Sequence, residues 1–286
     1  MSPGLRIAVC VKQVLDTGVP LAVANGAVRQ EAPWPIARVG AAERAALEAA
    51  LRWREQMGGA VLAVSVGQDE AEAALRLCLA RGAERAVHIV RADRLDAVGS
   101  ASAVARVLAN EAVDLVVCGG ASGDGASGLF PAVLAAELDA ALLTAVSGVR
   151  LEGRHLEVER RLERGNREQV SCELPAVLAV EPVLAEPRYI SVRAVQAARE
   201  RMVETVHSSE GPSPGYDLLA LEPAKPRPKR VSGPDARLSA MDRLAHLVTG
   251  GVQQKQSGGF TEGAADQVAD AILRYLQDKG FVRGRT

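Results

Sequence analysis

The sequence predicts an α/β protein with three layers, in which helices cover both faces of a mostly parallel sheet. From Leu5 to Leu138, short apolar segments alternate with longer stretches of helical periodicity. Strands that alternate with helices in this way form right-handed βαβ units and therefore a parallel sheet. The apolar segments also lack the in–out alternation of a half-exposed strand, which indicates burial on both faces.

The elements of this core are predicted from apolar runs and from the residues that end helices. The strands are Leu5–Val11, Ala60–Ser65, Ala86–Val90 and Leu115–Cys118. The helices are Ala41–Met57, Asp69–Ala80, Ala97–Asn110 and Leu129–Leu138. Gly58-Gly59 ends the first helix, and Pro131 is tolerated in the first turn of the last. Asn25-Gly26 predicts a hairpin between Leu21–Val23 and Ala27–Arg29.

The pattern changes after Leu138. Three alternating segments predict antiparallel strands added to the edge of the sheet. These segments are Thr144–Leu151, His155–Leu162 and Gln169–Cys172. Pro175–Val180 is apolar again, as a strand returning to the core would be. A helix is predicted over Val192–Val203.

The composition of the C-terminal part predicts an extended arm. His207–Pro234 is rich in Pro, Ser, Gly and Lys, which cannot form a core and predicts an extended segment. Two amphipathic helices are predicted after it, at Ala236–Leu247 and Ala264–Lys279. The second needs an apolar groove, in this chain or in another, for its stripe of Val268, Ile272, Tyr275 and Leu276. We therefore predict an α/β domain over residues 1–206 and an arm with helices over residues 207–286.

Composition excludes some classes of partner. The formal charge is −1, from 34 basic and 35 acidic residues, which argues against nucleic acid or an anionic membrane as the main partner. No apolar run is as long as the roughly 18 residues that a membrane helix needs. Met1–Leu5 carries no signal-peptide pattern, so the protein is expected to be soluble and cytoplasmic.

The sequence carries no catalytic or metal-binding constellation. The cysteines form no Cys-x-x-Cys pair and are predicted to be buried thiols: Cys10, Cys78, Cys118 and Cys172. The histidines lie on separate predicted elements, without the spacing of metal ligands: His88, His155, His207 and His246. No activated nucleophile is predicted either.

The segment from Asp114 to Gly128 joins a strand, a glycine-rich loop and a helix N-terminus. Its loop consists of Gly119, Gly120, Ala121, Ser122, Gly123, Asp124, Gly125, Ala126, Ser127 and Gly128. Bare backbone N–H groups converge where the helix dipole is positive, which predicts a phosphate site. The spacing matches neither Walker A nor GxGxxG, so a plain turn that needs positive φ is the alternative. Asp124 and Ser127 favour the phosphate site, because an unliganded loop has little reason to place polar groups among glycines.

In their order and spacing, these landmarks resemble the β-subunit of the electron transfer flavoprotein (ETF) family across essentially the whole chain. The matching segments are Val11–Thr17, Leu47–Ala50 with Arg54-Glu55, Val64–Gly67, Leu75-Arg76, Leu79–Ala86, Asp114–Gly128, Val158–Arg160, Leu174–Val177 and Glu186–Tyr189. The resemblance implies an adenine nucleotide α-hydrolase-like fold, which is Rossmann-like. It also implies a heterodimer whose α-subunit holds most of an FAD.

The resemblance further implies an electron carrier between flavin dehydrogenases and a quinone oxidoreductase or another redox partner, without acid–base catalytic residues of its own. The cleft of the β-subunit itself holds AMP in many members. In members that bifurcate electrons it holds a second FAD, which oxidises NADH. By this resemblance, residues 1–206 bind an adenine nucleotide and residues 207–286 pack on the partner subunit.

Matching positions also imply the residues of two sites. The nucleotide contacts come from Cys10, through its backbone, from Val66 and from the glycine loop. Within that loop Asp124 takes a ribose or loop-ordering role, and Ser127 and Gly128 lie at the phosphate.

The second site docks partner dehydrogenases. Its segment is Glu186, Pro187, Arg188 and Tyr189, with Val192 as the apolar anchor. An ordinary buried valine is the alternative for Val192. Arg160 matches a family position near the subunit boundary, where a solvated strand arginine is the alternative.

The chain also departs from the family. Gly40-Ala41 stands where many members have Asn-Pro, and Ala185 where Asn is usual. The glycine loop lacks the Asp-rich form common in members that hold AMP. Ala198–Arg201 reverses a charge within the usual lysine-rich run, which points to an unusual redox partner. Outside the family, the alternative is a stand-alone ATP- or AMP-binding regulatory protein with the same fold.

Overall fold

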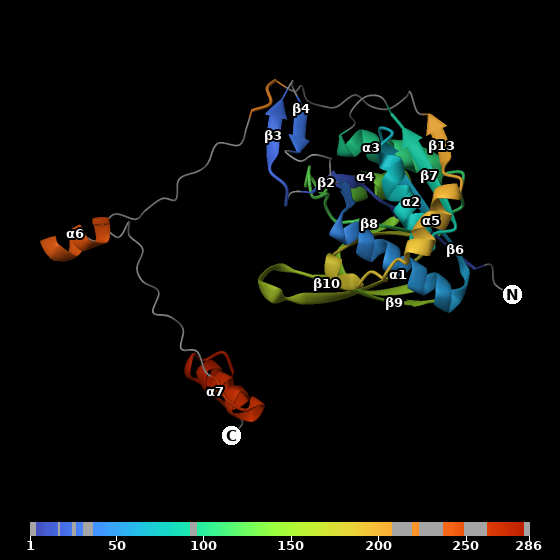
Figure 1. Ribbon diagram of the computed structural model, residues 1–286. Helices are drawn as coiled ribbons and strands as arrows, with labels where there is room; N and C mark the ends of the chain where they lie inside the picture. The colour runs from blue at the N-terminus through green and yellow to red at the C-terminus, as the bar shows by residue number, and fades with distance from the viewer. Residues whose placement is uncertain are drawn as a thin grey trace. The chain divides into compact units, whose positions relative to one another are not determined.

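The three-layer α/β prediction is confirmed in a computed structural model, which describes residues 4–16, 18–24, 27–30, 37–91, 96–207, 219–222, 237–248 and 262–282 (Figure 1). The chain divides into two units, residues 1–223 and residues 224–286. The first unit contains the large sheet and the helices that cover it.

The large sheet has nine strands. Their order is β11 (Arg167–Glu173), β10 (His155–Arg161), β9 (Ala141–Glu152), β12 (Ala176–Val180), β8 (Leu115–Gly119), β1 (Leu5–Cys10), β6 (Gly59–Gly67), β7 (Arg85–Val90) and β13 (Glu204–His207). From β9 to β13 in this order the strands run parallel. β10 and β11 are the antiparallel addition at one edge.

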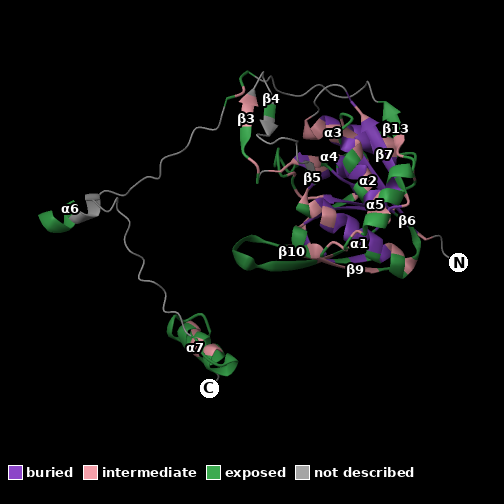
Figure 2. Cartoon of the chain, viewed as in Figure 1, coloured by how far each residue is buried: buried purple, intermediate pink, exposed green. Residues whose placement is uncertain are grey.

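Helices cover both faces of this sheet. On one face, α1 (Ala41–Met57) and α2 (Ala71–Arg81) pack with α5 (Val192–Glu200) over strand residues such as Ile7 and Leu178. On the other face, α3 (Ala97–Leu108) and α4 (Leu129–Glu137) pack over residues such as Ala8 and Val116. The buried residues therefore lie between the layers (Figure 2).

Two small sheets and two short 3-10 helices complete the first unit. β2 (Gln13–Leu15) pairs with β5 (Ala37–Val39), and β3 (Leu21–Ala24) pairs with β4 (Ala27–Gln30), both antiparallel. The second pair confirms the predicted hairpin, although its Asn25-Gly26 turn lies outside the described residues. The 3-10 helices are η1 (Glu163–Gly165) and η2 (Pro182–Leu184).

The structure corrects the sequence predictions at two places. The helix predicted over Val192–Val203 ends at Glu200, and the chain then forms β13, which pairs with the edge strand β7. Arg201 is the C-cap residue of the helix, with an extended backbone, and its guanidinium donates to the carbonyls of Leu79 and Ala83. β9 is also only partly an antiparallel addition, since its first half pairs in parallel with β12.

The strand register fixes where the glycine loop lies. Cys10 of β1 is paired with Cys118 of β8, and Gly119 is paired with Val180 of β12. The carboxyl ends of three neighbouring parallel strands therefore meet at one edge of the sheet. Open parallel sheets bind ligands at this edge.

The second unit contains α6 (Ala240–Val248) and α7 (Ala265–Asp278). Both predicted helices are thus present, each a few residues shorter than predicted. Large apolar side chains on them are exposed, among them Met241, Ile272 and Tyr275. Within the described residues, no helix is both long enough and apolar enough to span a membrane. Most of the predicted extended segment between 207 and 234 lies outside the described residues.

Candidate functional site

A cavity of about 660 Å³ lies at the carboxyl ends of β8 and β12. One side is formed by β2, β5 and the first turn of α1, and the other by the glycine loop and the start of β9. Apolar side chains such as Val14, Val39 and Val180 line much of it. Its volume falls in the range of roughly 300–1,000 Å³ that is usual for small-molecule sites.

The predicted nucleotide loop borders this cavity over part of its length. Gly120, Ala121, Gly123 and Gly128 line it. Gly119 ends β8 and packs against the first turn of α1. The other loop residues lie outside the lining: Ser122, Asp124, Gly125, Ala126 and Ser127. The structure therefore brings three of the loop's five glycines to the cavity, and the polar residues of the loop lie outside the lining.

Asp124 makes contacts that order the loop. Its Oδ1 accepts hydrogen bonds from Lys12 Nζ at 2.7 Å and from the backbone N–H of Gly125 at 2.6 Å. Ser122 Oγ accepts a hydrogen bond from the same N–H at 3.3 Å. Burial would raise the pKa of Asp124, but the hydrogen bonds from Lys12 and Ser122 outweigh it and lower the pKa. These contacts match the loop-ordering role that was one of its two predicted roles.

Ser127 and Gly128 form the start of α4. Gly128 has a φ of +67° and is the N-cap residue of the helix. Ser127 Oγ accepts a hydrogen bond from the backbone N–H of Leu129 at 3.4 Å. The first turn of α4 thus begins at the cavity wall, and a helix N-terminus attracts anionic groups through its free N–H groups and dipole.

Cys10 and Val66 lie at the ends of neighbouring strands β1 and β6 but do not line the cavity. The Cys10 side chain is buried, and burial raises its pKa to about 12. Its thiol is therefore neutral and unreactive at physiological pH. A nucleotide contact from Cys10 can come only from its backbone, as the resemblance implies.

Glu43 was not predicted as a site residue. It lies in the first turn of α1, lines the cavity and is 5% exposed. Burial raises the pKa of its carboxyl group. Its sequence context, between alanines and an arginine on a predicted helix, gave no sign of burial.

The wall formed by β9 is held by Arg160. Arg160 Nε donates to the Thr144 carbonyl and Nη2 to Thr144 Oγ1, both at 2.9 Å, and Nη1 donates to Glu168 at 2.9 Å. Thr144 and Ala145 line the cavity, and Ala145 has the unusual φ of +54° for a residue with a side chain. Arg160 is therefore not a freely solvated strand arginine, because it fixes the carbonyl beside this strained residue.

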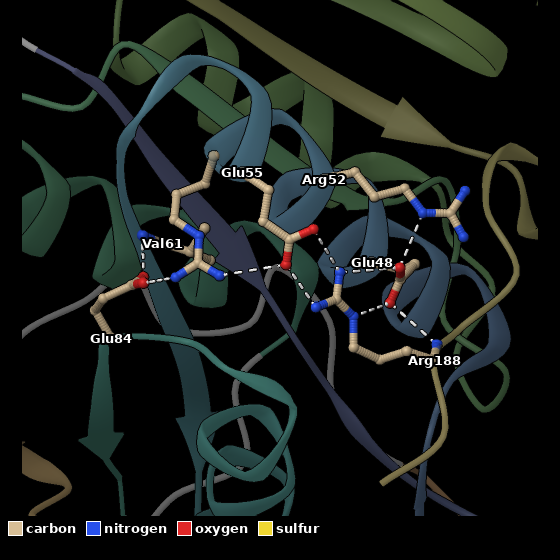
Figure 3. Close-up of polar contacts among 7 residues, drawn as sticks. Glu48, Arg52, Glu55, Val61, Glu84 and Arg188 are labelled. Carbon is tan, nitrogen blue, oxygen red and sulfur yellow. Dashed lines mark hydrogen bonds and ion pairs between the residues drawn. The ribbon is translucent and has the colours of Figure 1, made fainter.

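The predicted docking segment lies against α1, with Arg188 turned inward (Figure 3). Arg188 donates to Glu48 Oε2 from its backbone N–H at 3.0 Å and from Nε at 2.9 Å, and its Nη1 donates to Glu55 at 2.7 Å. Arg52 Nη2 donates to the carbonyl of Glu186 at 3.0 Å. The guanidinium of Arg188 is thus used within the chain.

Two side chains of the same segment point outward. Tyr189 is 87% exposed and Val192 is 69% exposed. Val192 is therefore not the buried valine that was the alternative. Ser191 accepts a hydrogen bond from the backbone N–H of Ala194 at 3.1 Å and so caps α5 directly beside Val192.

The far end of α5 is fixed as well. Arg76 of α2 donates through Nη1 to the carbonyls of Ala198 at 3.1 Å and Arg199 at 2.8 Å. Arg201 donates to the Ala83 carbonyl at 2.9 Å. Cations beside the last carbonyls of a helix also favour its dipole. Val192 is therefore presented at the start of a helix that is held at both ends, and Tyr189 lies three residues before it.

Comparison with known proteins identifies the family. A sequence model described as the electron transfer flavoprotein domain matches residues 36–210. The chain belongs to this family. It is 31% identical over 283 residues to the electron transfer flavoprotein subunit beta of Bacillus subtilis. This match covers 97% of this chain and 100% of the relative.

Other members of the ETF family match over somewhat shorter stretches. The subunit beta from Mycobacterium tuberculosis is 31% identical over 214 residues, covering 72% of this chain and 80% of the relative. The subunit beta from Homo sapiens is 30% identical over 243 residues, covering 80% and 91%. Membership of the ETF family implies a role in flavoprotein electron transfer.

The side chains described in this ETF-family chain also bear on metal binding. Among the residues described, no group of three or more His, Cys, Asp or Glu side chains could hold a metal ion. The predicted buried thiols are confirmed for Cys10, Cys78 and Cys118, and Cys172 is partly buried. The site therefore consists of glycines, apolar side chains and a few charged groups.

Arg188→Ala should destabilise the protein by about 3 kcal/mol at neutral pH, because it leaves the buried carboxylate of Glu48 without its main counter-charge. Burial would raise the pKa of Glu48, but the hydrogen bonds from Arg188 lower it below its ordinary value of 4.5. The stabilisation is therefore fully present above pH 4.5 and is lost as the pH falls through the lowered pKa. Urea unfolding at several pH values measures the difference between the two proteins.

Arg52→Ala is the matched control, since Arg52 also contacts Glu48 but its side chain is 50% exposed. Because half of the Arg52 side chain is in water and Glu48 keeps Arg188 in this variant, the expected loss is less than about 1 kcal/mol. Equal losses for the two variants would show that Arg188 is not the main counter-charge of Glu48.

Proposed function

We propose that this chain is the electron-carrier subunit of a heterodimeric electron transfer flavoprotein. The observation that carries the proposal is the glycine loop beside a nucleotide-sized cavity, in a chain that belongs to the ETF family. Electrons pass from flavin dehydrogenases to a quinone oxidoreductase or another redox partner through an FAD held mainly by an α-subunit. In this proposal the chain binds a nucleotide, packs on the α-subunit and docks the redox partner.

The proposed occupant of the cavity is AMP, or a second FAD if the protein bifurcates electrons and oxidises NADH. Both carry a phosphate that the N-terminus of α4 would bind, because that helix begins at Gly128 on the cavity wall. Both also carry an adenine, which the apolar side chains of Val14, Val39 and Val180 would cover.

We assign partner docking to Tyr189 and Val192, with Glu186, Pro187 and Arg188 holding the segment in place. An exposed aromatic and an exposed aliphatic side chain on a fixed helix start form a small apolar anchor. Because the segment is already ordered by Glu48 and Ser191, binding would not need to pay the entropy of folding it.

We assign to the second unit the role of packing on the α-subunit. α6 and α7 are amphipathic and each carry exposed apolar residues, such as Leu244 and Ile272. A helix of this kind needs an apolar surface to cover its stripe. The alternative of a stand-alone nucleotide-binding regulator leaves these helices without a partner and leaves the family membership unexplained.

Co-expression with an electron transfer flavoprotein α-subunit from the same organism should yield a heterodimer that contains one FAD and one AMP. Extraction of the purified complex, followed by chromatography and absorbance, counts both. Two FAD and no AMP would establish the bifurcating form and exclude the simple carrier. A chain that purifies without any flavin-bearing partner would contradict the proposal and favour the regulator.

Gly128→Val should remove the nucleotide of this chain and weaken the heterodimer, because a β-branched residue at a φ of +67° distorts the start of α4. We expect at least a tenfold loss of AMP affinity, about 1.4 kcal/mol, by titration calorimetry. Gly153→Val is the matched control, since Gly153 has a φ of +61°, open space around it and a place in the β9–β10 turn. If nucleotide content and assembly survive in the Gly128 variant, the glycine loop is only structural.

Val192→Asp should lower kcat/KM about tenfold or more for reduction of the heterodimer by the flavin dehydrogenase that reduces the wild type fastest, because a charge replaces the anchor. The FAD and AMP content should not change. Val183→Asp, at an equally exposed valine outside the 186–192 segment, controls for the added charge. Equal effects of the two variants would remove Val192 as the anchor.

A further inference from the structure

Among the described residues, Glu43 is a buried acid that forms no ion pair, although the charges of Lys12 and Arg44 act on it from a distance and lower its pKa in part. The buried acidic side chains of the described residues are Glu43 and Glu48, 5% and 2% exposed. Glu48 receives hydrogen bonds from Arg188 and Arg52. Within the same part of the chain, the Glu43 carboxylate has no ion pair, and its own backbone N–H is its hydrogen-bond donor.

The position of the Glu43 carboxylate is defined by two glycines. A Cβ atom on Gly40 would lie well inside contact distance of Glu43 Oε2, and a Cβ atom on Gly119 would lie 3.2 Å from it. The carboxylate thus occupies the space that side chains at these two positions would fill. It lies between the first turn of α1 and the end of β8, on the wall of the cavity.

A carboxylate in this position calls for a further hydrogen-bond donor. Its two oxygens offer about four acceptor sites, and one backbone N–H satisfies only one of them. Burial of an acidic group without enough donors is costly, and native proteins supply partners for nearly all such groups. Since Glu43 lines the cavity, a bound ligand can supply the missing donor in place of water.

The surrounding wall selects the kind of donor. Gly40 and Gly120 expose bare backbone, and Val14, Val39, Pro131 and Val180 are apolar, while the lining also contains the charged residues Asp16, Arg38, Arg44 and Glu181. A flat, uncharged ring fits such a wall, whereas a phosphate placed beside the carboxylate would be repelled. The phosphate of the ligand therefore belongs at the N-terminus of α4, and its heterocycle belongs beside Glu43.

We propose that Glu43 is a specificity-determining residue of the nucleotide site, and that it accepts a hydrogen bond from an N–H group of the bound heterocycle. The donor is the exocyclic amine of adenine or the imide N–H of a flavin. This inference rests on the proposed function, in which a nucleotide occupies this cavity. It adds the residue that distinguishes one ring from another.

Titration calorimetry on the full-length chain, freed of bound nucleotide, tests the adenine donor with AMP and with IMP. In IMP the amine is replaced by a carbonyl oxygen, which would face the carboxylate acceptor to acceptor. Hydrogen bonds to charged groups contribute about 1.5–3 kcal/mol, so the wild type should prefer AMP by about tenfold or more. In Glu43→Gln the carboxamide can donate or accept, and the preference should fall to within about threefold.

The flavin donor is tested in the same way with FMN and N3-methyl-FMN, in which a methyl group blocks the imide. A preference for FMN that is lost in Glu43→Gln would identify the flavin as the ring beside Glu43. A preference for AMP over IMP that is lost in that variant would identify adenine. Either result supports the proposal.

Controls separate recognition from structure. Glu43 also lies where an acidic side chain favours the helix N-terminus, so Glu43→Ala should lose stability as well as at least tenfold in affinity. A change in the ratio of AMP to IMP affinity in Glu43→Gln does not follow from stability alone. Glu70→Gln, at the N-cap of α2 and outside the cavity lining, should leave the ratio unchanged.

Two outcomes would overturn the claims, and they differ. If the wild type binds none of the four probes, the proposed nucleotide site itself fails. If the wild type binds AMP or FMN, but both Glu43 variants keep its affinities and its ratios, the site stands and the role of Glu43 is wrong.

Discussion

The contact between Glu48 and Arg188 is the interaction on which both functional regions depend. It joins the middle of α1 to the segment that precedes α5 (Figure 3). The same helix contributes its first turn, from Gly40 to Arg44, to the wall of the cavity. Because the buried carboxylate of Glu48 would be costly without Arg188, the docking segment cannot leave α1 easily. One helix therefore links the cavity to the exposed side chain of Val192, the two regions to which we assign nucleotide binding and partner docking.

The two buried glutamates of α1 show how the same residue type serves two purposes. Glu48 has a complete set of donors from within the chain, and its pKa is lowered even though burial would raise it. Glu43, one and a half turns earlier, has an incomplete set, and burial raises its pKa. A fold supports a structural acid by surrounding it with partners, whereas a binding acid keeps part of its capacity for the ligand. Local inconsistencies of this kind are expected at functional sites.

Much of the fold could be predicted because its strands and helices follow local rules. α1 has the predicted bounds of Ala41–Met57, since Gly58 ends it with a φ of +75°. β13 could not be predicted, because its only large apolar side chain is Val206 and the strand exists through pairing with the edge of β7. Its sequence lacks the pattern of a strand, and tertiary pairing overrides local preference there.

The site was predictable only where it consists of backbone. The run of glycines in the sequence predicts the loop. The burial of Glu43, in contrast, depends on the space left by Gly119, which is distant from Glu43 in sequence and adjacent to it only in the fold. The inward turn of Arg188 depends in the same way on Glu48 and Glu55. Resemblance to a family places such residues in a segment but does not say which way their side chains point.

The charges of the glycine loop bear on how a phosphate would be held. Lys12 is the cation nearest to the loop's polar residues, yet its ammonium group is 2.7 Å from Asp124 Oδ1 and is therefore neutralised locally. A phosphate would have to break this pair to use Lys12, and Asp124 would then repel it. At the start of α4 the Leu129 N–H already donates to Ser127 Oγ and Pro131 has no N–H, but the remaining backbone N–H groups of the first turn carry a fixed partial positive charge. A phosphate in this cavity would therefore use the backbone at the start of α4 rather than Lys12, while Lys12 and Asp124 hold the glycine loop in place.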